Sequence, residues 1–281
     1  MASLGERLEE LYRLVPWPED PRSEEGKRRY VEALSQMRKL LGHEWLKQLL
    51  ESRRKVSVLD VCGGTGIGGV ALARALQEAG VEVDLTILDL RRNALEVAFR
   101  WGREELGREV QVVEADARRA HEIGLRADIV LMYGLSAPHF DPWDMARLFS
   151  SVSEVLNSDG LFVIEETDRR YSIFFLQGYA RALAESAGED SLVASFHVGY
   201  SVRRGTFRRA TVKLPSAGRV VVSDFYFWGL AELMTLAWLF FEDVDFLPVR
   251  RSYSGFILTC KPRGRLRPSD LSRDPRVLRE T

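Results

Sequence analysis

Three aspartates in the first half of the chain each stand at the end of an aliphatic run that predicts a β-strand. Asp60 ends the run VSVLD, Asp89 ends VDLTILD, and Asp116 follows VQVVEA. An aspartate at one strand end is as readily a turn residue or a helix cap as a ligand-binding residue. Three in succession, with a glycine-rich turn after the first, predict one binding site along the carboxyl edge of a parallel sheet.

The glycine-rich turn alone is ambiguous. Gly64 to Gly69 satisfies the pattern G-x-G-x-x-G and Asp89 lies further along the chain, a combination that is the fingerprint of dinucleotide-binding enzymes. Asp60 argues against that interpretation, because a carboxylate next to the turn would repel a pyrophosphate at the helix N-terminus. The same charge suits a ligand that carries an ammonium and a sulfonium, such as S-adenosylmethionine. An NAD-dependent dehydrogenase is kept only as a minor alternative.

With S-adenosylmethionine as the ligand, each of the other strand ends has a role. Asp89 can accept hydrogen bonds from both ribose hydroxyls. Asp116 can accept one from the adenine amino group, and the backbone N–H of Ala117 can donate to a ring nitrogen. The sequence therefore predicts S-adenosylmethionine as the cofactor.

These motifs resemble those of the class I S-adenosylmethionine-dependent methyltransferases, over about residues 56–167 and more weakly over 229–261. LDVCGGTG resembles the family's first motif, ILDL its acidic second motif, EADAR its adenine motif, and DIVLMYG and NSDGLFVIEE its fourth and fifth strands. One departure is Cys62, where many members have a glycine that adopts positive φ more freely. The resemblance implies cofactor contacts from Asp60, Cys62, Gly63, Gly64, Gly66, Asp89, Leu90, Asp116, Ala117 and Tyr133.

The apolar pattern predicts the elements that must position these residues. Strands near 56–61, 83–88, 110–114, 127–132 and 160–165 alternate with helices near 67–79, 91–106, 141–156 and 170–187, which indicates an α/β fold with a doubly wound sheet. The resemblance implies a Rossmann-like sheet of seven mostly parallel strands. Three antiparallel strands are expected near 192–200, 206–214 and 219–227, before a final helix at 229–243 and two strands at 244–249 and 254–260.

We divide the chain accordingly. The parts are an N-terminal helical cap (1–55), a cofactor-binding core (56–167), a helix with an antiparallel substrate roof (168–228), the last helix and strand pair of the core (229–261) and a polar C-terminal tail (262–281). The cap is expected to lie over the cofactor end of the sheet.

Composition excludes several classes of protein. The 281 residues are 46% hydrophobic, and a formal net charge of −1 gives no general attraction to nucleic acid or membranes. No apolar run is long enough to span a bilayer, and the N-terminal segment is too charged for a signal peptide. Two cysteines make a disulfide framework or a cysteine-based metal site improbable. We expect a cytoplasmic protein without a metal, and the oligomeric state stays open.

Methyl transfer is an in-line displacement, for which a protein supplies orientation, exclusion of water and sometimes a base. His139 follows the fourth predicted strand, where cofactor and acceptor would meet, and is the first candidate for a base. Tyr133, His197 and Tyr200 are further catalytic candidates, although regular alternation would put His197 and Tyr200 on opposite faces of their strand. Aromatic residues of the cap and roof are candidate substrate contacts: Trp17, Tyr30, Phe227 and Trp228, with Tyr12 able to reach either ligand.

Three hypotheses for function remain. A small-molecule acceptor is favoured, because the motifs of base-amine and pyrimidine C5 methylation are missing after the fourth and fifth strands. Glu165-Glu166 resembles the paired carboxylates of arginine methyltransferases without their surrounding sequence, and we expect one glutamate at a solvated strand end. The Arg-rich hairpin at 203–209 keeps an RNA or protein acceptor as the alternative. A non-catalytic protein of the same fold is the third.

Overall fold

A seven-stranded sheet forms the centre of the molecule. The computed structural model describes residues 3–15, 17–51, 53–188, 191–215 and 220–279. The strand order is β10-β11-β5-β4-β1-β2-β3, with β11 antiparallel to both of its neighbours. This confirms the predicted α/β fold with a mostly parallel, doubly wound sheet. The strands are β1 (Lys55–Val61), β2 (Glu82–Asp89), β3 (Gln111–Glu114), β4 (Ala127–Met132), β5 (Leu156–Thr167), β10 (Phe241–Arg251) and β11 (Ser254–Pro262).

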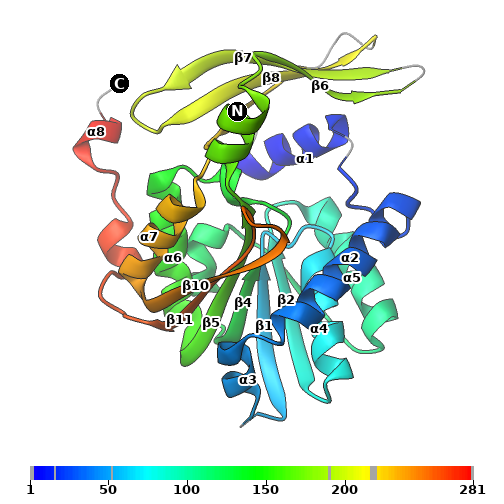
Figure 1. The fold of residues 1–281 in the computed structure, drawn as a ribbon, viewed down its shortest axis with the longest axis vertical. Helices are drawn as coiled ribbons and strands as arrows, with labels where there is room; N and C mark the ends of the chain where they lie inside the picture. The colour runs from blue at the N-terminus through cyan, green and yellow to red at the C-terminus, as the bar shows by residue number, and fades with distance from the viewer. Residues whose placement is uncertain (1–2, 16, 52, 189–190, 216–219, 280–281) are drawn as a thin grey trace.

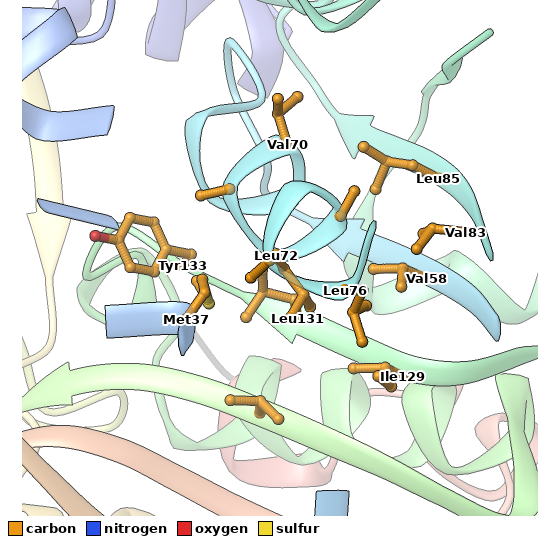
Figure 2. Packing of buried hydrophobic residues seen from close by; sticks show 14 of the residues in the cluster. Met37, Val58, Val70, Leu72, Leu76, Val83, Leu85, Ile129, Leu131 and Tyr133 are labelled. Atoms are coloured by element: carbon orange, nitrogen blue, oxygen red, sulfur yellow. The ribbon is translucent and has the colours of Figure 1, made fainter. Parts of the chain in front are cut away.

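Helices cover both faces of this sheet (Figure 1). On one face α4 (Ile67–Glu78), α5 (Arg92–Leu106) and α2 (Glu24–Leu40) share a core with the strands, and on the other α6 (Pro142–Val155) and α7 (Leu230–Phe240) share a second core. Figure 2 shows Leu72 and Leu76 of α4 packed against Val58 and Ile129 of the central strands. Full burial of such a side chain contributes about 1.5–3 kcal/mol. This packing therefore holds the start of α4, and the glycine turn before it, against the sheet.

The N-terminal helices do not act as one unit. The helix α1 (Leu4–Leu14), the turn that follows it and the first turns of α2 lie at the carboxyl edge of the large sheet, where α1 contacts the smaller sheet described below. In contrast α2 packs along α4, and α3 (Glu44–Glu51) lies near the opposite edge (Figure 1). Within the described part of 1–55, the carboxyl edge is thus covered by α1, the turn after it and the start of α2, whereas the rest of α2 and α3 lie elsewhere.

A separate four-stranded antiparallel sheet lies above the carboxyl edge (Figure 1). We call it the roof; it consists of β6 (Ala182–Ala187), β7 (Leu192–Ser201), β8 (Thr206–Leu214) and β9 (Val220–Phe225). Residue 219 and the start of the third expected strand lie outside the described residues. The helix α1 runs beneath the roof and contacts β8 and β9, so it lies between the roof and the large sheet.

The predicted helix at 170–187 is wrong. A short π-helix (η3, Arg170–Gln177) ends before Gly178, which adopts φ +75°, and residues 182–187 form β6. The sequence ALAESA has good helix propensity, but pairing with the edge of β7 outweighs it, as tertiary context commonly does. The roof therefore has one more strand than the sequence indicated.

The C-terminal tail is bound to the body of the protein. It contains a short helical turn (η4, Pro268–Leu271) and α8 (Arg276–Arg279). Ser150 and Arg147 of α6 donate to the carbonyls of Leu266 and Leu271, both at 2.9 Å, and Arg147 also pairs with Asp274. These bonds bring Asp274 to the edge of the cavity described next.

Candidate active site

A cavity of about 590 Å³ lies between the roof and the carboxyl ends of β1 to β4. Its walls come from α1, the strand ends, the roof and the C-terminal tail. A smaller hollow opens beside the glycine turn, under the turn that follows α1. The large cavity is lined by Cys62, Asp89, Leu90, Asp116, Ala117 and His139, and the small one by Cys62, Gly63, Gly64, Tyr133 and Trp17. Segments far apart in the sequence thus meet as predicted at one edge of the sheet.

Asp60 lies directly behind the glycine turn. Its Oδ2 accepts from the backbone N–H of Gly69 at 2.8 Å, whereas Oδ1 is buried without a hydrogen-bond partner among the described residues. Burial raises the pKa of this carboxyl to about 8, against which the Gly69 hydrogen bond acts. Gly63 has no room for a side chain, because a Cβ there would lie 2.7 Å from Asp60 Oδ2. An unpaired buried carboxylate separated from a hollow by glycine fits a cationic ligand group in that hollow.

Two glycines of the turn are required by close contacts. A Cβ on Gly68 would lie 2.4 Å from the Cβ of Tyr133, and Gly66 adopts φ +85° at the start of α4. Cys62 also has positive φ, at +57°, without being glycine. The departure from glycine noted in the sequence therefore keeps the backbone conformation at some conformational cost. Burial raises the pKa of the Cys62 thiol well above its usual value, so the residue is an inert part of the wall.

Asp89 connects the glycine turn to the next helix. Its Oδ2 accepts from Gly64 N at 2.8 Å, and its Oδ1 accepts from Arg91 N at 2.8 Å and Arg91 Nε at 3.3 Å. Arg91 is itself buried, pairs with Glu19 at 2.7 Å and stacks on the ring of Tyr12, with 4.1 Å between its Cζ and the ring centroid. The ribose candidate is therefore linked directly to the N-terminal segment.

Asp116 is part of a chain of ion pairs. Arg118 binds it through Nε at 3.0 Å and reaches Asp144 of α6 at 2.8 Å. Asp144 also accepts from Arg147 at 3.4 Å, which holds the tail at Asp274. The adenine candidate thus lies at the end of a charged network along one wall of the large cavity.

His139 and Tyr12 are in contact at the wall of the large cavity. The Tyr12 hydroxyl and His139 Nε2 are 3.4 Å apart, and the ring of Phe225 from the roof lies 5.6 Å from that of His139. Burial, with the charges of Arg169 and Arg91, lowers the pKa of His139 to about 4, and burial raises the pKa of Tyr12 to about 12. At neutral pH the pair is therefore a neutral imidazole beside a neutral phenol.

Two of the expected substrate contacts lie elsewhere. Tyr30 donates to Glu105 at 2.7 Å and packs on Trp101, between α2 and α5. Trp228 is 1% exposed, and its Nε1–H donates to the carbonyls of Ala137 and Phe140. Neither ring lines the large cavity or the small hollow, because each packs against other side chains in the core. Trp17 does line the small hollow, beneath the guanidinium of Arg29 at 5.1 Å.

The roof candidates His197, Tyr200 and Phe227 also lie outside both cavities. All three rings surround Phe207, at centroid distances of 6.0, 4.9 and 5.0 Å respectively. The expectation that His197 and Tyr200 lie on opposite faces is wrong, because the register of β7 shifts between His197 and Gly199. Such a bulge breaks the regular alternation on which the expectation rested.

The Arg-rich hairpin does not form one basic patch. Arg204 pairs with Asp141, and Arg208 pairs with Asp224 at 2.9 Å. Arg209 is buried in the roof, where it donates to Ser195 and to the carbonyl of Ala180. These three arginines point to different parts of the protein, and each already has an acidic or hydrogen-bonding partner there.

Several polar residues of the site were not found from the sequence. Glu19, Arg29 and Arg91 surround the small hollow, and Thr65 of the glycine turn donates to the carbonyl of Glu19. Glu19 and Arg29 precede the first strand by more than twenty residues, where no motif marks them. Arg91 directly follows the ILDL motif, and its charge next to Asp89 was the one available signal.

Comparison with known proteins agrees with this geometry. A family model described as a methyltransferase domain matches residues 58–160, and no curated protein matches the chain by sequence. An S-adenosylmethionine-dependent methyltransferase from Clostridium acetobutylicum is 12% identical, with a TM-score of 0.60 over 91% of this chain and 97% of its own. The sugar N-methyltransferase KedS8 from Streptoalloteichus is 18% identical, with a TM-score of 0.59 over 93% and 95%.

A third similar structure contains the cofactor. S-adenosylmethionine-bound CalS10, an amino pentose methyltransferase from Micromonospora echinaspora, is 16% identical, with a TM-score of 0.53 over 93% of this chain and 99% of its own. In the part of the chain that the structure describes, no helix is long and apolar enough to cross a membrane, and no cluster of three metal-binding side chains occurs. Residues 58–160 thus match a methyltransferase domain, and the chain has the fold of the class I S-adenosylmethionine-dependent methyltransferases.

Proposed function

We propose that this protein transfers a methyl group to an O–H or N–H group of a small molecule bound in the large cavity. The observation that carries the proposal is the facing pair of Tyr12 and His139, 3.4 Å apart between the strand ends and the roof. A cavity with walls from four separate parts of the chain suits a small acceptor better than a polymer. KedS8 and CalS10 are described as acting on sugars, which is consistent with a small polar acceptor here.

The cofactor is divided between the two cavities in this proposal. Asp89 and Leu90 receive the ribose, and Asp116 and Ala117 receive the adenine. The small hollow receives the methionine part, with Arg29 facing its carboxylate and the buried charge of Asp60 behind Gly63 favouring its ammonium. When bound, S-adenosylmethionine supplies an electrophilic methyl group on a sulfonium. Tyr133, Gly64 and Gly66 shape the cradle around it.

His139 and Tyr12 orient the acceptor. His139 is neutral at neutral pH, and in the tautomer with its proton on Nδ1 the Nε2 atom can accept a hydrogen bond from the acceptor and take its proton as the nucleophile attacks. Tyr12 remains protonated and can donate to the same group. The roof and α1 exclude water, which keeps the acceptor as the nucleophile that meets the methyl group.

Replacing His139 with glutamine should lower kcat about 10- to 100-fold, because the acceptor loses its base and part of its orientation. The dissociation constant of S-adenosylmethionine should stay nearly unchanged. In the wild-type enzyme kcat should be flat around pH 6–7 and fall only as the pH approaches the His139 pKa of about 4. Steady-state kinetics with an identified acceptor test this, with His43→Gln, at a histidine paired with Asp245 outside both cavities, as the control. Unchanged turnover in His139→Gln would leave proximity and orientation as the only source of catalysis.

The alternative acceptor, RNA, is tested through salt dependence. Each phosphate neutralised by the Arg-rich hairpin would contribute about 0.7 to the slope of log affinity against log salt for single strands. Because Arg204, Arg208 and Arg209 are already paired or buried, we expect no salt-sensitive RNA binding. Binding that disappears when these three and Arg203 become glutamine would overturn the small-molecule proposal. A non-catalytic protein would bind S-adenosylmethionine in a titration without producing S-adenosylhomocysteine with any acceptor.

A further inference from the structure

The loop after β4 carries His139 and has a strained start. Gly134 adopts φ +97° and Leu135 adopts φ +62°, and the second of these is unfavourable for a residue with a side chain. Such a conformation persists only where the surroundings hold it in place. The short helical turn η2 (Ala137–His139) then brings the imidazole into the cavity.

Two adjacent glutamates at the end of β5 are next to this loop. Glu165 Oε2 accepts from the backbone N–H of Gly134 at 2.9 Å. Glu166 Oε1 accepts from Arg169 Nε at 3.0 Å, and Nη2 of the same arginine donates to the carbonyl of Leu135 at 3.2 Å. Successive residues of a strand point to opposite faces, so the loop is held from both sides of β5.

Neither glutamate is the solvated strand end that the sequence suggested. Both are buried, and burial raises the pKa of each carboxyl. Glu166 Oε2 has no hydrogen-bond partner among the described residues. Glu166 Oε1 also accepts from Thr167 N at 2.9 Å, so the cost of burying this carboxylate comes from the Oε2 atom that has no partner.

The loop after β4 is also bound by Trp228, which is itself bound to Arg169. Trp228 Nε1–H binds the carbonyls of Ala137 and Phe140, and the backbone N–H of Arg169 donates to the Trp228 carbonyl at 2.9 Å. Arg169 is thus fixed both to the loop and to the segment that pins the loop. Its guanidinium is one of the two positive charges that act on His139, the other being Arg91.

We propose that Glu166 is a positioning residue for His139: it fixes Arg169 under the loop, and its negative charge offsets the guanidinium beside the imidazole. The charged or titratable groups facing His139 are then Tyr12 from α1, Arg91 after β2 and Arg169 after β5, and Glu166 compensates the last. The inference rests on the proposed role of His139 in the reaction. Without Glu166 the loop loses its support and the imidazole faces an uncompensated cation.

The test is a charge cycle read at His139 itself. In protein labelled with ¹³C-histidine, the His139 resonance is titrated in the wild type, Glu166→Gln, Arg169→Met and the double variant. We expect a lower His139 pKa in Glu166→Gln, a higher one in Arg169→Met and a value near that of the wild type in the double variant. Glu165→Gln is the matched control: Glu165 is also buried and adjacent, and the glutamine keeps an oxygen that can accept from Gly134 N, so the loop keeps this anchor and the His139 titration should not change. The double variant keeps the test valid if Arg169→Met does not fold.

Kinetics give the second readout. Glu166→Gln should lower kcat about tenfold with the dissociation constant of S-adenosylmethionine unchanged, since the change acts on one general base. The same His139 titration in all variants, with the fold intact, would overturn the inference. If instead the titrations shift as expected while His139→Gln remains fully active, the support of the loop is upheld and the base role of His139 fails, so the two claims fail separately.

Discussion

Replacing Asp89 with alanine is expected to raise the dissociation constant of S-adenosylmethionine about 10- to 150-fold. Two ribose hydroxyls would lose a charge-assisted hydrogen-bond partner worth about 1.5–3 kcal/mol. The structure adds a second cause, because the same carboxylate accepts from Gly64 N and from Arg91. Its removal therefore loosens both the glycine turn and the contact with the N-terminal segment.

Isothermal titration measures this effect directly. Asp84→Ala is the matched control: Asp84 lies on the same strand, is exposed and pairs with Lys55 at 2.8 Å away from both cavities. It should bind the cofactor as the wild type does. Wild-type affinity in Asp89→Ala, or tight binding of NAD by the unaltered protein, would refute the assignment of this residue to the ribose.

The second large effect concerns the proton on Asp60. With its pKa raised to about 8 by burial, the carboxyl is mostly protonated in the cofactor-free protein at pH 7. A cationic cofactor favours the carboxylate, so binding below pH 8 should release a proton. Affinity should then rise with pH from about 6 to 8, by at most tenfold per pH unit, and fall above about 8, where the ligand's ammonium loses its proton.

Titration at pH 7 in buffers with different ionisation enthalpies measures the released proton. In Asp60→Asn, the part of the release that comes from Asp60 should vanish and affinity should fall. Any proton uptake that remains in the variant belongs to the ligand's own amino group, which is bound as an ammonium, so the difference between the two proteins gives the contribution of Asp60. If the wild type and Asp60→Asn release the same number of protons, Asp60 does not ionise on binding.

The raised pKa of Asp60 also predicts that the stability of the cofactor-free protein falls as the pH rises, opposite to the affinity for the cofactor. A folded pKa above the unfolded value of 3.8 means that the folded state keeps a proton which the unfolded state loses. Stability of the cofactor-free protein should therefore fall as the pH rises from about 4 to 8, by at most about 1.4 kcal/mol per pH unit, and Asp60→Asn should be more stable than the wild type at pH 8. Chemical denaturation at several pH values gives the difference.

The residues that sequence could assign are those whose positions follow from short-range rules. Asp60, Asp89 and Asp116 each end a recognisable strand, and parallel strands bring their carboxyl ends to one edge. Predicting those strands was therefore enough to bring the three carboxylates together. His139 followed from the same rule, since it lies just after β4.

Long-range contacts decided the rest. Tyr30 and Trp228 were assigned to substrate because they are aromatic and near the site in sequence, but packing against Trp101 and around η2 uses their surfaces. His197 and Tyr200 share a face because of a bulge that their alternation does not reveal. Glu19 reaches the site through a turn with no regular periodicity, and Arg29 reaches it from α2, where the apolar spacing does not show which polar side chain points to the sheet edge.

Asp89 and Arg91 also determine what it costs to admit a ligand. A carboxylate accepts about four hydrogen bonds, and Asp89 already receives three, from Gly64 N, Arg91 N and Arg91 Nε. A ribose that takes two more must displace Arg91 Nε, and the same guanidinium holds Glu19 and Tyr12. The ribose thus replaces the Arg91 guanidinium on Asp89, and the measured binding free energy is the gain from the ribose hydrogen bonds minus the cost of losing the Arg91 hydrogen bond. Substitutions in the N-terminal segment, far in sequence from the strand ends, can in this way tune how long S-adenosylhomocysteine stays bound after the reaction.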